Sequence, residues 1–74
     1  MFEKIKKVIF EVTGNGAIVV ETDFVKDLGL NSFDVVNIIG TFEDEYGIRV
    51  PARDMWKLRR VSDLMDYLRA KGIQ

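Results

Sequence analysis

Apolar residues recur at helical spacing in three separate stretches of the chain. The first stretch lies within residues 2–12, where intervals of three and four residues separate Phe2, Ile5, Ile9 and Val12, with Val8 beside them. Such spacing gathers these side chains on one face of a helix and leaves the lysines on the other face. The sequence TGNG at residues 13–16 is a turn signal, so it predicts the end of this helix.

The other two stretches predict two further main helices. One spans residues 32–46, and Gly47 follows it at a position that tolerates a left-handed backbone. The other begins near Ser62, a residue type that favours the N-cap position, and ends at Gly72. The side chains expected to be buried in these two helices are Val35, Ile39, Phe42 and Tyr46, flanked by Val36, and then Leu64, Met65 and Leu68.

The connections between these helices predict a long ordered loop and one short helix. Residues 17–20 are apolar and partly β-branched, but no second run of this kind exists to pair with them, which favours a loop over a strand. Phe24 and Leu28 are expected to anchor the loop around a short helical turn at residues 23–27. After Pro51, residues 52–58 favour one or two short turns. The predicted fold is all-α: a small four-helix bundle of three main helices and one short helix, formed by residues 1–74 as one domain.

The composition argues against catalysis by the chain itself. The 74 residues include no cysteine and no histidine, although 47% of them are apolar, as in an ordinary folded domain. Without these two residue types the chain lacks thiolate nucleophiles, the commonest general base and the commonest ligands of transition metals. We therefore expect neither catalytic residues nor a metal site.

The hydropathy and the charge of the chain limit where the protein can reside and which molecules it can bind. The longest apolar run, at residues 17–20, is far too short to cross a bilayer, and the first ten residues lack the apolar core of a signal peptide. These features predict a cytoplasmic protein with no membrane span, and we expect a monomer. The net charge of −1 makes nucleic acid an improbable partner, but seven acids and one lysine occupy residues 21–46 whereas bases outnumber acids in residues 52–74.

Ser32 stands where the second apolar pattern begins, within the sequence DLGLNSFD. On a structural interpretation, Asn31 or Ser32 caps the helix and Asp34 completes a capping box. If Asn31 does this alone, the Ser32 hydroxyl is free to face solvent in the first turn. A phosphate on that oxygen would then lie near the exposed N–H groups and the positive end of the helix dipole. Both interpretations are compatible with the sequence.

The stretch FVKDLGLNSFDVVNIIGTFEDEYGIRVP resembles the central segment of acyl carrier proteins, in which a Leu-Gly-x-Asp-Ser-Leu-Asp run precedes a long acidic helix. The similarity extends over nearly the whole chain, from the lysine-bearing first helix to the closing VSDLMDYL. It implies that Ser32, flanked by Asn31 and Asp34, is the attachment point of 4′-phosphopantetheine. A phosphopantetheinyl transferase would transfer this group from coenzyme A with Mg²⁺, and its thiol would carry an acyl chain as a thioester.

The resemblance also implies partners and surfaces for them. Acyl-transferring, condensing or ligase enzymes of fatty-acid, lipid or polyketide-type biosynthesis would receive the cargo. The residues expected to dock them are Phe33, Asp34, Val36, Asn37, Gly40, Glu43 and Asp44, with Trp56 on a second surface. The residues expected to line an acyl pocket, in addition to packing the core, are Phe24, Ile39, Phe42, Ile48, Leu58 and Leu64.

Several positions depart from the family pattern. Asn31 replaces the usual aspartate, Phe33 replaces a leucine, and Asn37 stands where an acid is common. Residues 53–60 are basic and contain Trp56, whereas this segment is typically acidic in the family. Together these departures favour a carrier with a dedicated pathway over a housekeeping carrier.

Two alternative functions stay open on the sequence. A carrier of aminoacyl or other small-acid groups would use the same serine. An unmodified helical interaction module would keep the fold and use the charged faces alone. An enzyme acting through Ser32 would lack a nearby base.

Overall fold

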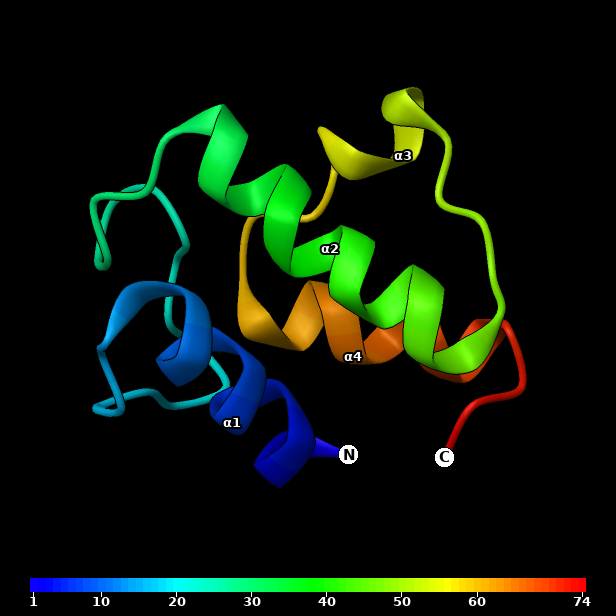
Figure 1. Ribbon diagram of the computed structural model, residues 1–74, viewed down its shortest axis with the longest axis horizontal. Coiled ribbons are helices and arrows are strands. Elements are labelled where there is room, and N and C mark those ends of the chain that lie inside the picture. The colour runs from blue at the N-terminus through cyan, green and yellow to red at the C-terminus, as the bar shows by residue number, and fades with distance from the viewer.

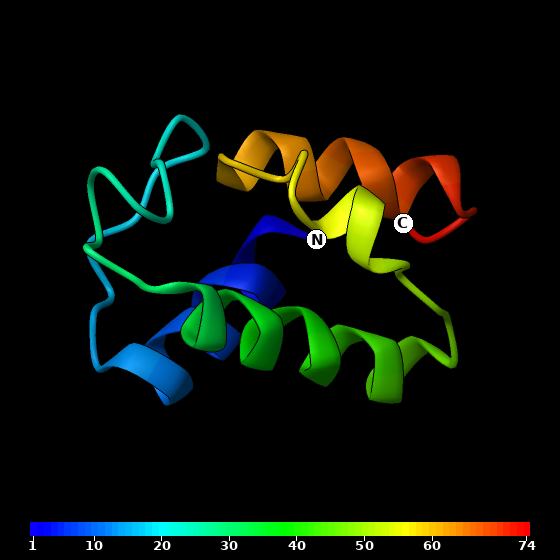
Figure 2. The ribbon, with the colours of Figure 1, turned by 90° about the horizontal axis from the view of Figure 1, so that it is seen from above.

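The computed structural model describes residues 1–74 and confirms the all-α fold. Its elements are α1 (Phe2–Thr13), α2 (Ser32–Tyr46), α3 (Ala52–Met55) and α4 (Val61–Ala70). α2 and α4 run in the same direction, α1 runs the opposite way, and the short α3 lies in the connection from α2 to α4 (Figures 1 and 2). No helix is both long and apolar enough to cross a membrane.

The core consists of 16 buried apolar residues contributed by all parts of the chain except α3. The predicted positions Ile5, Val8 and Ile9 of α1 are buried, as are the core positions predicted in α4. In α2 the buried set is wider than predicted, because Ile38 joins Val35, Ile39 and Phe42. One helix face can cover two neighbours only if its apolar stripe widens in this way.

Three apolar positions differ from the prediction. Val12 is 37% exposed, because it lies in the last turn of α1 where the core ends. Tyr46 and Phe2 are only half-buried, whereas Val36, which was predicted to flank the stripe and to dock partners, is 39% exposed on the outer side of α2. The stripe predicted for α2 was therefore wrong at its last turn.

The ends of α1 and α2 form as the glycines predict. Gly14 and Gly47 have φ values of 77° and 63°, which belong to the left-handed region that glycine adopts at low cost. Their N–H groups donate to the carbonyl oxygens of Phe10 and Glu43, so each helix ends with its last carbonyls partly satisfied.

The prediction that Ser62 caps α4 is wrong. The N-cap residue is Arg60, and the carboxylate of Asp63 accepts the N–H groups of Arg59 and Arg60 at 3.1 and 2.9 Å. The N–H of Ser62 donates to the carbonyl oxygen of Val20 at 2.8 Å. The helix starts earlier than predicted because the long loop, distant in sequence, supplies acceptors that a local cap would otherwise provide.

The long loop between α1 and α2 contains no strand, as predicted, but it pairs with the segment before α4. The N–H of Phe24 donates to the carbonyl oxygen of Arg59 at 2.9 Å, and the N–H of Val61 donates to that of Thr22 at 3.0 Å. Phe24 is buried, Leu28 is half-buried, and the turn at residues 23–27 is closed by a 3.0 Å bond from the N–H of Asp27 to the carbonyl oxygen of Asp23. The predicted anchors and the predicted turn are therefore confirmed.

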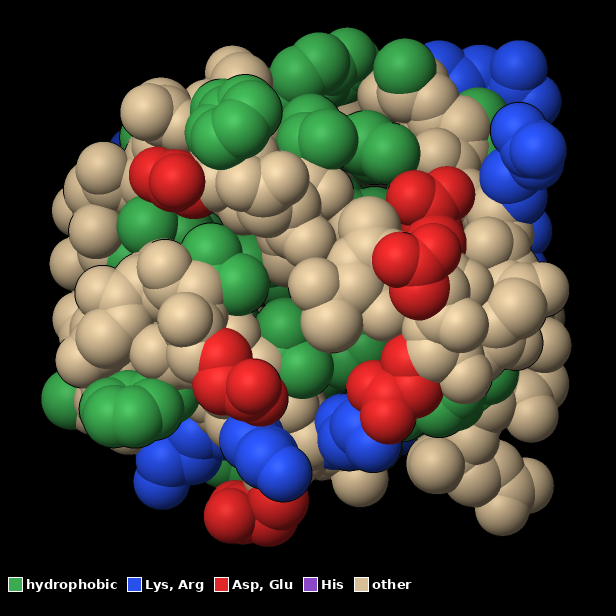
Figure 3. Space-filling model, viewed as in Figure 1, with side chains coloured by type: hydrophobic (Ala, Val, Ile, Leu, Met, Phe, Trp, Pro, Cys, Tyr) green, Lys and Arg blue, Asp and Glu red, His purple; other side chains and the backbone are tan.

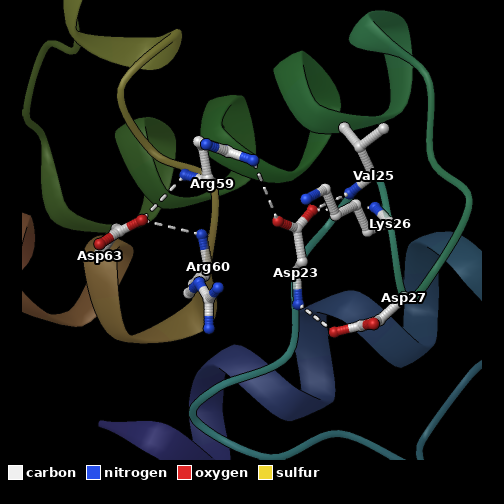
Figure 4. Close-up of polar contacts among 7 residues, drawn as sticks. All are labelled: Asp23, Val25, Lys26, Asp27, Arg59, Arg60 and Asp63. Atoms are coloured by element: carbon white, nitrogen blue, oxygen red, sulfur yellow. Dashed lines mark hydrogen bonds and ion pairs between the residues drawn. The ribbon is translucent and has the colours of Figure 1, made fainter.

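The carboxylate of Asp23 holds this turn together (Figure 4). Its Oδ1 atom accepts the N–H groups of Val25 and Lys26, each at 2.9 Å. The hydrogen bond from Lys26 is the largest influence that holds the pKa of Asp23 below its ordinary value, aided by Val25 and by the charge of Arg59 and opposed by burial. The ionised form of this side chain is therefore favoured in the folded state.

Two further contacts fix α3 against its neighbours. The Oε2 atom of Glu43 accepts the N–H of Val50 at 2.9 Å, and the Tyr67 hydroxyl donates to Asp54 at 2.8 Å. α3 has only four residues and fully buries none of them, so these bonds, at Asp54 and just before the helix, supplement the packing of Met55 against the core.

The difference between the two faces of α2 predicts a difference in stability. Ile39→Val removes one methylene from a side chain that is 1% exposed, which should lower the free energy of unfolding by about 1 kcal/mol. Val36→Ala on the outer face should change it by less than about 0.5 kcal/mol. Urea unfolding followed by circular dichroism measures both values, and equal losses would contradict this account of the core.

The lowered pKa of Asp23 predicts how its contribution depends on pH. A carboxyl whose pKa is lower in the folded state stabilises the protein above its unfolded pKa and loses that effect as the pH falls through its folded pKa. Asp23→Asn keeps the oxygen that the turn needs but removes the charge. We therefore expect the variant to be less stable than the wild type at neutral pH, with a difference that shrinks in acid. Urea unfolding from pH 7 downward measures this, and a difference independent of pH would refute it.

Candidate functional site

Ser32 is the first residue of α2, and its side chain is exposed. Asn31 is the N-cap: its Oδ1 accepts the N–H of Asp34 at 2.9 Å, and Oδ2 of Asp34 accepts the N–H of Asn31 at 3.4 Å. The capping box is thus complete without Ser32, as one of the two interpretations of the sequence requires. No protein group hydrogen-bonds to the Ser32 hydroxyl.

The backbone before Ser32 turns sharply to place it there. Gly29 has a φ of 66°, in the region that other residues rarely adopt. The N–H of Leu30 then donates to the carbonyl oxygen of Phe24 at 3.0 Å, and the Leu30 side chain is buried. These two features join the loop to the helix and aim the start of α2 away from the core.

A cavity of about 300 Å³ opens beside Ser32. It lies between the turn at residues 23–26, the start of α2 and the segment from α3 to Arg59. Six of its ten lining residues are hydrophobic; the full set is Asp23, Phe24, Val25, Lys26, Ser32, Val35, Met55, Trp56, Leu58 and Arg59. The exposed serine therefore stands at the edge of a largely apolar cavity.

Only part of the predicted acyl pocket lines this cavity. Phe24 and Leu58 do so, whereas Ile39, Phe42 and Leu64 are each 1% exposed in the core, and Ile48 is half-buried elsewhere. Periodicity identifies residues that face the interior but not those that border a void. It therefore missed Val35 and Met55, and nothing in the local sequence marked Asp23, Lys26 or Arg59 as cavity residues.

The residues predicted to dock partners lie mostly on the surface. Phe33, Val36 and Trp56 are 71%, 39% and 59% exposed, and Trp56 also lines the cavity. Figure 3 shows hydrophobic side chains gathered across the start of α2 and the neighbouring α3. Exposed apolar surface of this kind is typical of a site that meets another molecule.

The polar residues of the predicted docking face differ in how exposed they are and in whether they already bond within the protein. Asn37 and Asp44 are exposed, but Glu43 is half-buried and holds the N–H of Val50. A Cβ added to Gly40 would meet no atom within 4 Å, so the surface beside this glycine is open. The face is therefore less acidic in effect than the sequence suggests.

Figure 3 shows acids over the later part of α2 and bases beyond α3, whereas acids and bases lie next to one another over α1. The Lys4 ammonium pairs with Glu45 at the end of α2, and the hydrogen bond to Glu45 raises the pKa of Lys4 above its ordinary value. This contact neutralises one acid of α2. The bases Arg53, Lys57, Arg59 and Arg60 are all exposed.

Because Asn31 and Asp34 cap α2, Ser32 should contribute little to the stability of the fold, and two variants test this. Asn31→Ala should lower the free energy of unfolding by about 1 kcal/mol, because the N–H of Asp34 loses its acceptor. Ser32→Ala should change it by less than about 0.5 kcal/mol, since alanine is a good helix former and no bond is lost. Urea unfolding of the two variants decides the matter. A loss in Ser32→Ala as large as that in Asn31→Ala would mean that Ser32 has a structural role.

Comparison with known proteins agrees with this geometry. A family model described as the phosphopantetheine attachment site matches residues 3–68. The chain is 36% identical over 72 residues to an acyl carrier protein of Clostridium acetobutylicum, covering 95% of this chain and 94% of the relative. A solved Mycobacterium tuberculosis structure described as that of an acyl carrier protein superposes with a TM-score of 0.87 at 25% identity, covering 95% of this chain and 96% of the other. The chain therefore belongs to the acyl carrier protein family, whose prosthetic group is covalently attached 4′-phosphopantetheine.

Proposed function

We propose that this chain carries acyl groups as thioesters on a 4′-phosphopantetheine arm attached to the Ser32 hydroxyl. The observation that carries the proposal is the position of Ser32, which is exposed, free of hydrogen bonds and at the edge of an apolar cavity. The only other serine, Ser62, is half-buried in the first turn of α4 and does not line the cavity.

The start of α2 suits a phosphodiester at Ser32. The first N–H groups of a helix have no partner within it, and the helix dipole adds partial positive charge at this end. Because Asn31 occupies only the N–H of Asp34, the N–H groups of the first turn stay available to a phosphate oxygen. Asp34 contributes by completing the cap, so the two flanking residues hold the helix start in place.

The arm would supply a thiol, which the chain lacks, and so a thioester bond to the cargo. The chain's own contribution is to hold and shelter that cargo. Phe24, Val35 and Leu58 offer apolar surface within reach of the attachment point, and each methylene that enters the cavity gains about 0.8 kcal/mol. Catalysis would come from partner enzymes.

The partners in this proposal are a phosphopantetheinyl transferase with Mg²⁺ and enzymes that transfer, condense or ligate acyl groups in fatty-acid, lipid or polyketide-type biosynthesis. Exposed Phe33 and Val36, with Asn37, Gly40 and Asp44 further along α2, form the surface that they would contact. The acids of α2 would orient a basic partner and add little affinity. Trp56 and the neighbouring bases extend this surface, which supports a dedicated pathway.

The transfer of the arm tests the proposal directly. The purified chain is incubated with coenzyme A, Mg²⁺ and a broad-specificity phosphopantetheinyl transferase, and its intact mass is measured. Wild type and the matched control Ser62→Ala should each gain one phosphopantetheine, and Ser32→Ala should gain none.

Failure of the wild type to gain mass with several transferases would contradict the proposal. It would favour an unmodified interaction module, in which the exposed apolar and charged surfaces recruit proteins directly. Asn31→Asp restores the usual acid beside the serine and is the matched variant in that case. If it alone is modified, the missing charge at residue 31 prevents recognition by these transferases.

A further inference from the structure

The cavity beside Ser32 is apolar except for one wall, which is formed by Asp23, Lys26 and Arg59. The Asp23 side chain is only 6% exposed, yet its Oδ2 atom has no hydrogen-bond partner. Buried carboxylate oxygens are normally hydrogen-bonded, because leaving one without a donor is costly. An unpartnered acceptor therefore lies buried in a residue that lines the cavity, beside the exposed Arg59 side chain.

The other oxygen of this carboxylate, Oδ1, already accepts two hydrogen bonds. Oδ1 takes the N–H groups of Val25 and Lys26, whereas Oδ2 has only the guanidinium of Arg59, with Nη2 at 3.9 Å. That distance is too long for a hydrogen bond. Figure 4 shows the carboxylate between the turn and the Arg59 segment, with one oxygen directed toward each. The Arg59 side chain is 65% exposed, so it is free to move and admit a group between the two charges.

The charges on this wall select the kind of group that fits. One carboxylate stands with two cations, Lys26 and Arg59, so a cationic cargo group would meet excess positive charge. An anionic group would instead be brought against the buried carboxylate of Asp23. A neutral group that donates to Oδ2 and accepts from the guanidinium avoids both penalties. Hydroxyl and amide groups have this property.

We propose that Asp23 Oδ2 and the Arg59 guanidinium form a polar subsite of the cavity that binds a neutral hydroxyl or amide group on the chain tethered at Ser32. The inference rests on the proposed function, because it concerns the group that Ser32 would carry. Two sources offer this chemistry: the amides of the phosphopantetheine arm itself, and a hydroxyl on the cargo, as in a 3-hydroxyacyl thioester. Asp23 is thus a specificity-determining residue as well as the residue that holds the turn.

Asp23→Asn isolates the subsite from the turn. Val25 and Lys26 both present N–H donors, so the remaining carbonyl oxygen stays with them and the new NH₂ group takes the place of Oδ2. The variant exchanges an acceptor for a donor at the cavity wall and leaves the turn intact. Asp27→Asn is the matched control, because Asp27 belongs to the same turn and accepts the N–H of Asp23 but does not line the cavity.

The experiment loads the wild type and both variants with 3-hydroxyoctanoyl and with 3-oxooctanoyl phosphopantetheine, supplied as the coenzyme A thioesters with a broad-specificity transferase. The hydroxyl donates and accepts, whereas the ketone only accepts. Intact mass confirms loading, and the thermal midpoint Tm is the readout. In the wild type and in Asp27→Asn, the hydroxyacyl form should melt higher by roughly 4–8 °C, the shift expected for one net hydrogen bond in a domain of this size. In Asp23→Asn that difference should vanish or reverse.

The unacylated arm provides the remaining comparison. If the arm's own amides occupy the subsite, attachment of the free arm should raise the Tm of the wild type more than that of Asp23→Asn, with no difference between the two cargoes. Fluorescence of Trp56, the sole tryptophan and a lining residue, reports independently whether the cavity fills. If loading succeeds but neither the arm nor the cargo distinguishes Asp23→Asn from Asp27→Asn, the subsite is refuted and the carrier function stands. Failure to load at Ser32 overturns both.

Discussion

Three backbone hydrogen bonds between the long loop and residues 59–62, where α4 begins, organise the side of this molecule that carries Ser32. They join Phe24 to Arg59, Val61 to Thr22 and Ser62 to Val20, at 2.8–3.0 Å. The loop contains no strand or long helix of its own, so these bonds and its buried side chains Ile18, Phe24 and Leu30 hold it in place. The three bonds also hold together the two segments of the cavity lining that contain Phe24 and Arg59. They also satisfy the N–H groups of Val61 and Ser62 and so add to the local cap that Asp63 forms with Arg60, which explains why α4 begins at Val61.

At the start of α2, capping the helix and presenting a free hydroxyl are done by different residues, although one serine could have done either. Asn31 and Asp34 satisfy the helix end, and Ser32 keeps its hydroxyl free at the edge of the cavity. A serine that capped its own helix would lose that cap when a phosphodiester formed on its oxygen. In this arrangement attachment of an arm need not destabilise α2. The fold thus supports a modified side chain at the position where a helix dipole favours an anion.

Local patterns predicted the parts of the structure that depend on local interactions. The bounds of α2 followed from Asn31, Asp34 and Gly47, which all act within a turn of the helix they delimit. The start of α4 was predicted wrongly because its first N–H groups bond to residues distant in sequence. The cap of α2 by Asn31 and Asp34, which leaves the Ser32 hydroxyl free, was also one of the two interpretations that the motif allowed.

The cavity wall could not be predicted in the same way. Ile39, Phe42 and Leu64 satisfied the same periodicity as Val35, yet only Val35 borders the cavity. The pairing of Asp23 with Arg59 depends on the loop geometry, which no periodic pattern encodes. Helical spacing distinguishes inside from outside, but the position of a void depends on how several elements pack together.

The most direct test of the central claim is to locate the modification. After incubation with coenzyme A, Mg²⁺ and a transferase, trypsin releases residues 27–49, which contain Ser32, and residues 61–69, which contain Ser62. Tandem mass spectrometry of the two peptides shows which one carries the added phosphopantetheine. We predict the full gain on Ser32 of the first peptide and none on the second. A gain on Ser62, or on neither peptide, would contradict the role assigned to the start of α2.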